Sequence, residues 1–204
     1  MARTLSPGRL LIEALYNTKD KGGVTGMAMY NNKGDFIAKY DMPTADGGDG
    51  YGYDITINPS RNALLTASFI GNNNYMRNLG DLIKDGEAMK KFGNTMVLWD
   101  LKAMKPKQVL TVPGALLEIR WSLKPGTTGP SPPRRSPPNC GSSSRTGRNE
   151  QFLRGFAWDG KELKQTFEVD FTKEKLGRAH HMKFGTASLK SAFDTDASPA
   201  LAQR

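Results

Sequence analysis

The chain has 204 residues, enough for one domain of ordinary size, and carries 29 Lys and Arg against 20 Asp and Glu, a formal net charge of +9. The basic residues form no stripe interleaved with aromatics, so no nucleic-acid partner is expected. A single cysteine, Cys140, excludes an internal disulfide. No apolar run is long enough to span a membrane, and MARTLSPGR lacks the apolar core of a signal peptide, so we expect a cytoplasmic chain with no membrane partner.

In chain order, the first part reads as short apolar strands separated by polar turns. A strand-length apolar run comes first, and a turn rich in Asn, Lys and Gly then separates two strands that make a hairpin. Further alternating runs continue the pattern as far as the middle of the chain. The expected strands are residues 10–16, 27–30, 36–42, 53–57, 63–70, 95–99, 108–112 and 117–123.

One segment has a different period. Leu82, Ile83, Met89 and Phe92 follow roughly helical spacing within residues 81–92, and Gly93 comes directly after them. This pattern predicts a short surface helix inside a long loop.

An internal repeat gives the fold class. Hairpins that open on Met29-Tyr30, Leu98-Trp99 and Ala157-Trp158 alternate with a second kind of hairpin, so that two hairpins make a four-stranded unit. Serial four-stranded units predict an all-β protein, a partial β-propeller with about two to three blades. A propeller that does not close exposes strand edges, through which self-association is expected.

The stretch from Thr127 to Arg148, TTGPSPPRRSPPNCGSSSRTGR, does not resemble the rest of the chain. It contains five prolines and four arginines and no acidic residue. One interpretation is a disordered linker, because such a tract buries too little surface to offset chain entropy. The other is a shifted reading frame, since the same nucleotides, with GC-rich codons, can spell DNWAITATALTAKLWLIKQDG, a turn followed by a strand pattern. Both interpretations remain open, and both predict disorder over residues 127–149.

Four further stretches carry a resemblance to a known family. They are GGDGYGYDITINP (47–59), NTMVLWDL (94–101), PGALLEIRWSLKPG (113–126) and GRAHHMKFG (177–185). Together they resemble the selenium-binding proteins, whose bacterial members include methanethiol oxidases. The resemblance covers roughly residues 7–126, as consecutive blades, and 150–185, as C-terminal propeller strands; residues 186–204 are expected to form a flexible tail.

The resemblance implies a seven-bladed propeller, a copper site made of histidines, oxidation of methanethiol by oxygen, and selenium association. It also implies that an N-terminal region and a block of propeller between the two matched parts are missing. His180 would be the metal ligand, and adjacent His181 would point to the opposite face. One imidazole does not hold copper firmly, so we expect an inactive fragment with no stably bound cofactor. The alternative is a non-catalytic partial propeller that binds other proteins, and a complete bacterial parent could be periplasmic.

The remaining candidates have structural interpretations. Asp46, Asp49 and Asp54 lack the spacing of a calcium loop and are interpreted as turn acids before a strand. Trp99, Trp121 and Trp158 are expected to pack between blades. Glu118 and Arg120 share a strand face and form either an ion pair near the propeller channel or a solvated pair. No set of residues for nucleophilic catalysis is present, and Cys140 is assigned no role.

Overall fold

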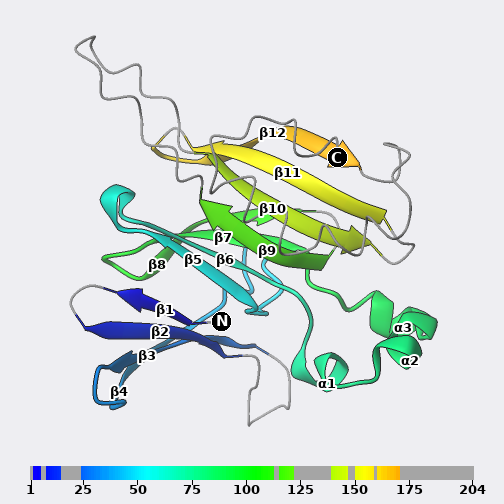
Figure 1. The fold of residues 1–204 in the computed structure, drawn as a ribbon, viewed down its shortest axis with the longest axis horizontal. Coiled ribbons are helices and arrows are strands. Elements are labelled where there is room, and N and C mark those ends of the chain that lie inside the picture. The colour runs from blue at the N-terminus through cyan, green and yellow to red at the C-terminus, as the bar shows by residue number, and fades with distance from the viewer. Residues whose placement is uncertain are drawn as a thin grey trace, which may run out of the picture.

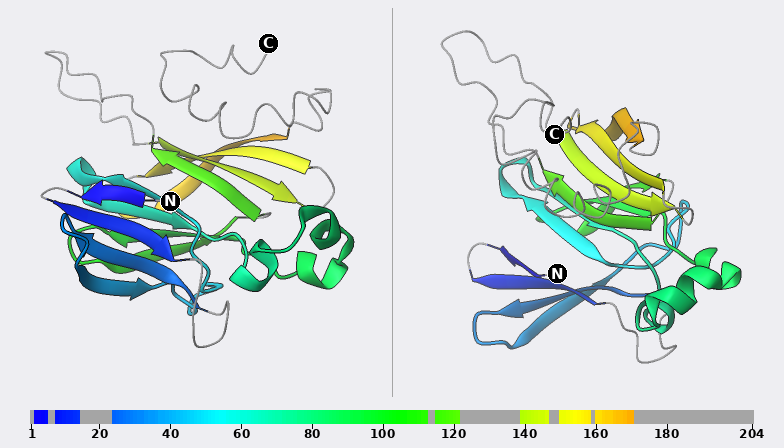
Figure 2. Two further views of the ribbon diagram at one scale, coloured as in Figure 1. Left: turned by 60° about the horizontal axis from the view of Figure 1, so that its bottom comes forward. Right: turned by 45° about the vertical axis from the view of Figure 1, so that its right-hand side comes forward.

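Three four-stranded antiparallel sheets stack in chain order in the computed structural model (Figure 1). The structure describes residues 2–5, 8–14, 24–112, 115–121, 139–146, 150–158 and 160–170. Two side views show the sheets layered on one another, with a group of short helices projecting at one side (Figure 2). No helix of the described residues is long and apolar enough to cross a membrane. The described residues form mostly antiparallel strands, with only a few short helices. The expectation of an all-β chain is confirmed.

Sheet 1 is a meander in which each strand pairs with the next along the chain. Its strands are β1 (Ala2–Leu5), β2 (Arg9–Ala14), β3 (Gly26–Asn31) and β4 (Phe36–Asp41). The β3–β4 turn is organised by Asn31, whose Oδ1 accepts hydrogen bonds from the backbone N–H groups of Lys33 (2.8 Å) and Asp35 (2.9 Å). This hairpin was predicted from the turn residues and is confirmed.

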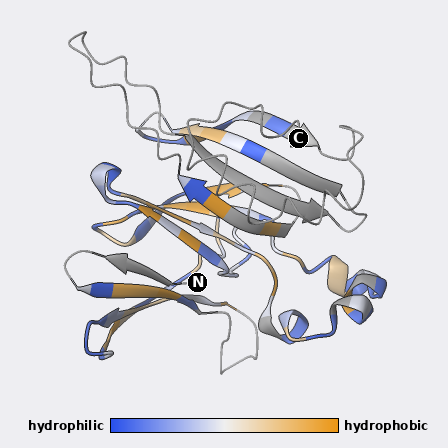
Figure 3. Ribbon diagram, in the orientation of Figure 1, coloured by the Kyte–Doolittle hydropathy of each residue, from blue (hydrophilic) through white to orange (hydrophobic). Residues whose placement is uncertain are grey.

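Sheet 2 lies in the middle of the stack and is buried on both faces. It contains β5 (Asp54–Asn58), β6 (Ala63–Ala67), β7 (Thr95–Asp100) and β8 (Lys105–Thr111), with a 3-10 turn η1 (Pro59–Arg61) after β5. Every residue of β6 is buried, as are the first five of β7. This explains why these two strands read as continuous apolar runs rather than alternating ones. Figure 3 shows hydrophobic colour along stretches of the central strands, and hydrophilic colour on turns, on parts of the helices and on some strand ends.

Alternate side chains of sheet 2 form two separate apolar layers. One layer joins sheet 2 to sheet 1 and contains Leu11, Met27, Met29, Met42, Ile55, Leu64, Val97, Trp99 and Met104. The other joins sheet 2 to sheet 3 and contains Ala63, Leu65, Ala67, Met96, Leu98, Val112, Leu116, Ile119, Trp121, Phe156, Trp158 and Leu163. The period of two along β6 and β7 thus distributes their residues between both neighbouring sheets.

Sheet 3 contains β9 (Ala115–Trp121), β10 (Asn139–Thr146), β11 (Glu150–Trp158) and β12 (Leu163–Asp170), in that spatial order. The hairpin that was predicted to open on Ala157-Trp158 is confirmed, because β11 pairs antiparallel with β12. β5 and β9 are the first strands of successive sheets, which confirms the repeat inferred from the sequence. Residues 171–204, including the expected tail, lie outside the described residues.

β10 is a correction to the sequence analysis, because residues 139–146 fall within the tract predicted to be disordered. This strand pairs with β11 over eight residues and with β9 through a register shift between Ser143 and Ser144. The physical reason is that pairing needs only backbone donors and acceptors. The five prolines of the tract all precede residue 139, so β10 keeps every N–H group.

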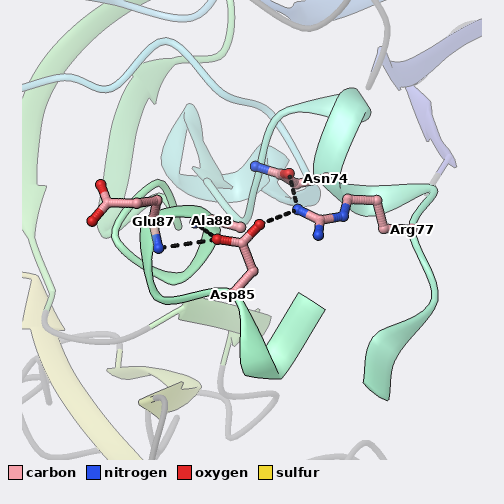
Figure 4. A network of polar contacts seen from close by, with 5 residues as sticks. All are labelled: Asn74, Arg77, Asp85, Glu87 and Ala88. Atoms are coloured by element: carbon pink, nitrogen blue, oxygen red, sulfur yellow. Dashed lines mark hydrogen bonds and ion pairs between the residues drawn. The ribbon is translucent and has the colours of Figure 1, made fainter. Parts of the chain in front are cut away.

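The excursion between β6 and β7 is also more finely divided than predicted. It contains α1 (Asn72–Tyr75), α2 (Leu79–Lys84) and α3 (Gly86–Met89) in place of one helix over residues 81–92. Asp85 separates α2 from α3 with an extended backbone, and its Oδ1 accepts hydrogen bonds from the N–H groups of Glu87 and Ala88 (Figure 4). A side chain that caps a new helix start interrupts the pattern that the spacing of apolar residues suggested.

Candidate functional site

The histidines singled out by the sequence, His180 and His181, lie outside the described residues. So does the side chain of Cys140. Within the described ranges, no group of three or more His, Cys, Asp or Glu side chains is placed to hold a metal ion. The polar groups that the fold does bring together lie where sheet 2 begins and meets sheet 3.

Asp54 links the first strands of sheets 2 and 3. It opens β5, is fully buried, and its Oδ2 accepts hydrogen bonds from the backbone N–H of Ile119 (2.9 Å) and from Nη1 of Arg120 (2.7 Å). Its Oδ1 accepts the N–H of Ile55 at 2.9 Å. A buried carboxylate requires such partners, because removing a charge from water without compensation is costly.

Arg120 presents its guanidinium from β9 in one fixed orientation. Nη1 donates to Asp54 and to the carbonyl oxygen of Ile119, both at 2.7 Å, while 24% of the side chain stays exposed. The structure pairs Arg120 with Asp54, a partner that the sequence analysis did not consider. The side chain of Glu118, the partner considered there, lies outside what the structure describes.

Asp49 ties the β4–β5 connection to the excursion that carries the helices. Its Oδ2 accepts hydrogen bonds from Ser68 Oγ at 2.6 Å and from the N–H of Asn94 at 3.0 Å, while Oδ1 accepts the N–H of Tyr51 at 3.0 Å. These contacts agree with the interpretation of Asp49 and Asp54 as structural acids before a strand.

Gly93 makes the close approach around Asp49 sterically feasible. A Cβ atom at this position would lie 2.6 Å from Ser68 Oγ and 2.7 Å from Asp49 Oδ2. The same Ser68 hydroxyl accepts the N–H of Thr95 at 2.8 Å, at the start of β7. Sequence analysis placed Gly93 at the end of a helix. In the structure its lack of a side chain instead allows Ser68 and Asp49 to come into contact.

The three tryptophans pack between sheets, as expected. Trp99 is 1% exposed in the layer between sheets 1 and 2, and its Nε1 donates to Thr66 Oγ1 at 2.9 Å. Trp121 and Trp158 lie in the layer between sheets 2 and 3 with ring centroids 6.0 Å apart. Among the residues that the structure describes, the buried Nε1 groups of these two tryptophans have no hydrogen-bond acceptor.

Sequence reasoning missed the long-range partners of these residues. The Asp54–Arg120 link joins positions 66 residues apart, and the Asp49–Ser68 bond joins positions 19 apart. A signal was available, since Asp54 stands at the start of a strand whose first three residues are buried, where solvation is lost. Within the described residues this arrangement fixes two junctions between elements.

Comparison with solved structures identifies the fold class. The structure is similar to that of a hypothetical selenium-binding protein from Sulfolobus tokodaii, with a TM-score of 0.58 and 20% identity, over 80% of this chain and 34% of that one. No protein-family model matches the sequence. At this identity the likeness establishes a shared fold only, an all-β arrangement of antiparallel sheets.

Sequence comparison identifies the family. The chain is 39% identical to a methanethiol oxidase of Hyphomicrobium sp over 94% of its length, and 31% identical over 91% to a methanethiol oxidase of Ruegeria pomeroyi. The chain belongs to the family of these methanethiol oxidases. Each match covers 66% of the relative, so the chain spans slightly less than two thirds of the length of these proteins.

Proposed function

We propose that this chain is part of a methanethiol oxidase-like protein and is inactive by itself. The observation that carries the proposal is the 39% identity over 94% of the chain to a protein named methanethiol oxidase. The complete parent would oxidise methanethiol, a small thiol, with oxygen. Association with selenium, the property after which the related fold is named, is proposed for the parent on the same grounds.

An internal gap in the match supports the view that a block of the parent is missing. The match to the Hyphomicrobium protein extends over 285 positions, yet 94% of 204 residues is only about 192. The difference, about 93 positions, is sequence that the relative has and this chain lacks. We place that gap at the tract of residues 127–148. A shifted reading frame at this tract would be recognised in the nucleotide sequence around codons 126–150.

The serial sheets support a propeller for the parent. Each sheet is a four-stranded antiparallel meander, and successive sheets pack face to face through apolar layers. Sheet 2 is covered on both faces, whereas sheets 1 and 3 each have one neighbour in this stack. A parent with more sheets would close the ring and give every sheet two neighbours.

Copper is the metal that the resemblance implies, and the described residues do not provide a site for it. The implied ligand, His180, lies outside the described residues, and a lone imidazole is a weak ligand set for a redox metal. We therefore expect weak copper binding that falls further on His180→Ala and changes little on His181→Ala. Equilibrium dialysis of the purified chain and both variants against Cu²⁺ measures this difference.

The test of activity is methanethiol consumption by the purified 204-residue chain in oxygenated buffer with added copper. The Hyphomicrobium methanethiol oxidase, assayed in parallel, is the positive control. The proposal expects background consumption by the chain and turnover by the control. Turnover by the isolated chain, together with one tightly held copper per molecule, would contradict the claim that the fragment is inactive.

A further inference from the structure

A cavity of about 370 Å³ lies between sheets 1 and 2, at the end of sheet 2 opposite to the helical excursion. Arg9, Met29 and Tyr40 line it from sheet 1. From sheet 2 it is lined by the β5–β6 turn and by the β7–β8 turn, residues 101–104. Its volume falls in the range of small-molecule sites, which is roughly 300–1,000 Å³.

The charges around this cavity are all of one sign. The exposed side chains of Arg9 and Lys102 line it, and no acidic residue does. Within the described part of the chain neither cation takes part in an ion pair. Two such cations facing one cavity make it attractive to an anion.

The nearest turn carboxylate is already engaged elsewhere. Asp100 Oδ1 accepts the N–H groups of Lys102 (3.1 Å) and Ala103 (2.9 Å) and the Nδ2–H of Asn62 (2.9 Å), while its Oδ2 lies 3.3 Å from Lys107 Nζ. The negative charge of Asp100 is therefore directed into its own turn and balanced by Lys107, which does not line the cavity.

The rest of the lining is apolar and held in place. Met29 and Met104 belong to the buried layer between sheets 1 and 2, with exposed fractions of 3% and 8%. The turn that carries Lys102 is fixed because the backbone N–H of Lys102 donates a hydrogen bond to Asn62 Oδ1 at 2.8 Å. The cavity thus combines a rigid apolar floor with two cations and the Tyr40 ring at its wall.

We infer that this cavity binds a small organic anion, a single carboxylate or sulfonate head group on a short alkyl tail. Arg9 and Lys102 hold the head group, and the planar guanidinium of Arg9 can donate two parallel hydrogen bonds to it. The methionine side chains contact the tail. Charge alone would favour any anion, whereas the apolar floor selects those with a tail. The site involves neither His180 nor the junction at Asp54, so it is independent of the proposed oxidase ancestry.

The experiment is a titration of the full-length chain, labelled with ¹³C at the methionine methyl groups, with sodium hexanoate. Met29→Leu and Met104→Leu assign the two signals from the cavity. Hexanoate is expected to shift these two signals saturably, whereas hexanol, which lacks the charge, and acetate, which lacks the tail, bind more weakly. Arg9→Gln and Lys102→Gln should each weaken hexanoate binding about tenfold, the loss of one charge-assisted contact.

The matched control is Lys84→Gln, which removes one exposed charge from α2 in the helical excursion and should leave the affinity unchanged. Two results would overturn the inference. One is the absence of any saturable shift at Met29 and Met104. The other is an affinity that falls equally in all three charge variants, because this would indicate attraction to the net positive charge rather than a site.

Discussion

At the scale of single residues, Asp54 links sheets 2 and 3 through hydrogen bonds to the N–H of Ile119 and to Arg120. Replacing it with Asn removes a carboxylate charge that lies 2.7 Å from the partly buried guanidinium of Arg120. We expect Asp54→Asn to lower the free energy of unfolding by about 3 kcal/mol, the lower end of the range for breaking a buried ion pair, because 24% of Arg120 stays solvated. Urea denaturation measures this change.

The matched control for that variant is Asp41→Asn. Asp41 pairs with Lys39 at 3.4 Å, and both side chains are mostly exposed, at 59% and 72%. Loss of an exposed pair should cost at most about 1 kcal/mol. Equal effects of the two substitutions would show that the Asp54 link does not hold the sheets together.

The lowered pKa of Asp100 leads to a prediction about the stability of the fold at low pH. The N–H of Ala103, the Nδ2–H of Asn62 and the ammonium of Lys107 lower the pKa of its carboxyl from 3.8 to about 2. A carboxyl whose pKa is lower in the folded chain than in the unfolded one stabilises the fold above the unfolded pKa, and this contribution is lost as the pH falls from about 4 to 2. The stability difference between the wild type and Asp100→Asn should therefore shrink over this interval.

Denaturation series at several pH values, with a carboxyl NMR titration of Asp100, provide the measurement. A titration midpoint near 4 would show that the turn contacts are not made in solution. The pKa of Asp85 is also lowered, chiefly by the N–H of Ala88 and then by Arg77, so its carbon signals serve as a second site in the same titration.

At the scale of elements, Gly93 tests how the helical excursion is attached. In Gly93→Ala the new Cβ would collide with Ser68 Oγ and Asp49 Oδ2, so the two junction residues must separate. We expect a loss of about 1–3 kcal/mol, the usual cost of overpacking, measured by thermal denaturation. Hydrogen exchange should quicken at Asn94 and Thr95 in particular.

Gly86→Ala is the paired control within the same excursion. A Cβ at Gly86 meets nothing within 4 Å, and the residue opens α3, where alanine is the better helix former. This substitution should be neutral or stabilising by up to about 1 kcal/mol. A larger loss at Gly86 than at Gly93 would refute the role given to the Asp49 junction.

The pairing of strand β10 leads to a prediction about hydrogen exchange of its backbone amides. Because it pairs on both sides, the amides of residues 140–145 should be protected to the same degree as those of residues 154–157 in β11. Hydrogen exchange read by NMR compares the two strands directly. Exchange of β10 at the rate of an unstructured peptide would restore the sequence-based expectation of disorder for this tract.

Most strands of the first two sheets could be predicted from the sequence, because their turns carry strong local signals. The Asn31 turn and the polar turn before Ala63 are examples, and each separates two strand-length runs. The helices were less predictable, since Asp85 caps α3 through a local bond that outweighs the spacing of apolar residues. β10 could not be predicted, because its pairing depends on two edges contributed by other strands.

At the scale of the whole molecule, the site was the least predictable part. The residue proposed as a ligand, His180, came from a resemblance and lies outside the described residues. The contacts that the structure does show, such as Asp54 with Arg120, join distant parts of the chain and leave no local pattern. The cavity beside Arg9 likewise exists only because two sheets meet there.

The end of the stack at sheet 1 leads to a prediction about self-association. Phe36 and Ile37 on β4 are 58% and 45% exposed, an unusual position for large apolar side chains. We propose that copies of the chain associate through this edge. Sedimentation should show a mass that rises with protein concentration, and Phe36→Lys should reduce it, whereas Met76→Lys, at a 73% exposed residue of the excursion, should not.

Sheet 3 combines strand β9, which precedes the aberrant tract, with strands β11 and β12, which follow it. With the gap of about 93 positions placed at this tract, as proposed above, these strands would descend from different repeats of the ancestor. They still form one sheet, because repeats share backbone spacing and hydrogen-bond pattern whatever their side chains. In such an architecture the ends of a deleted segment need not coincide with the boundaries of repeats, because the inner strand of one repeat can pair with the outer strands of another.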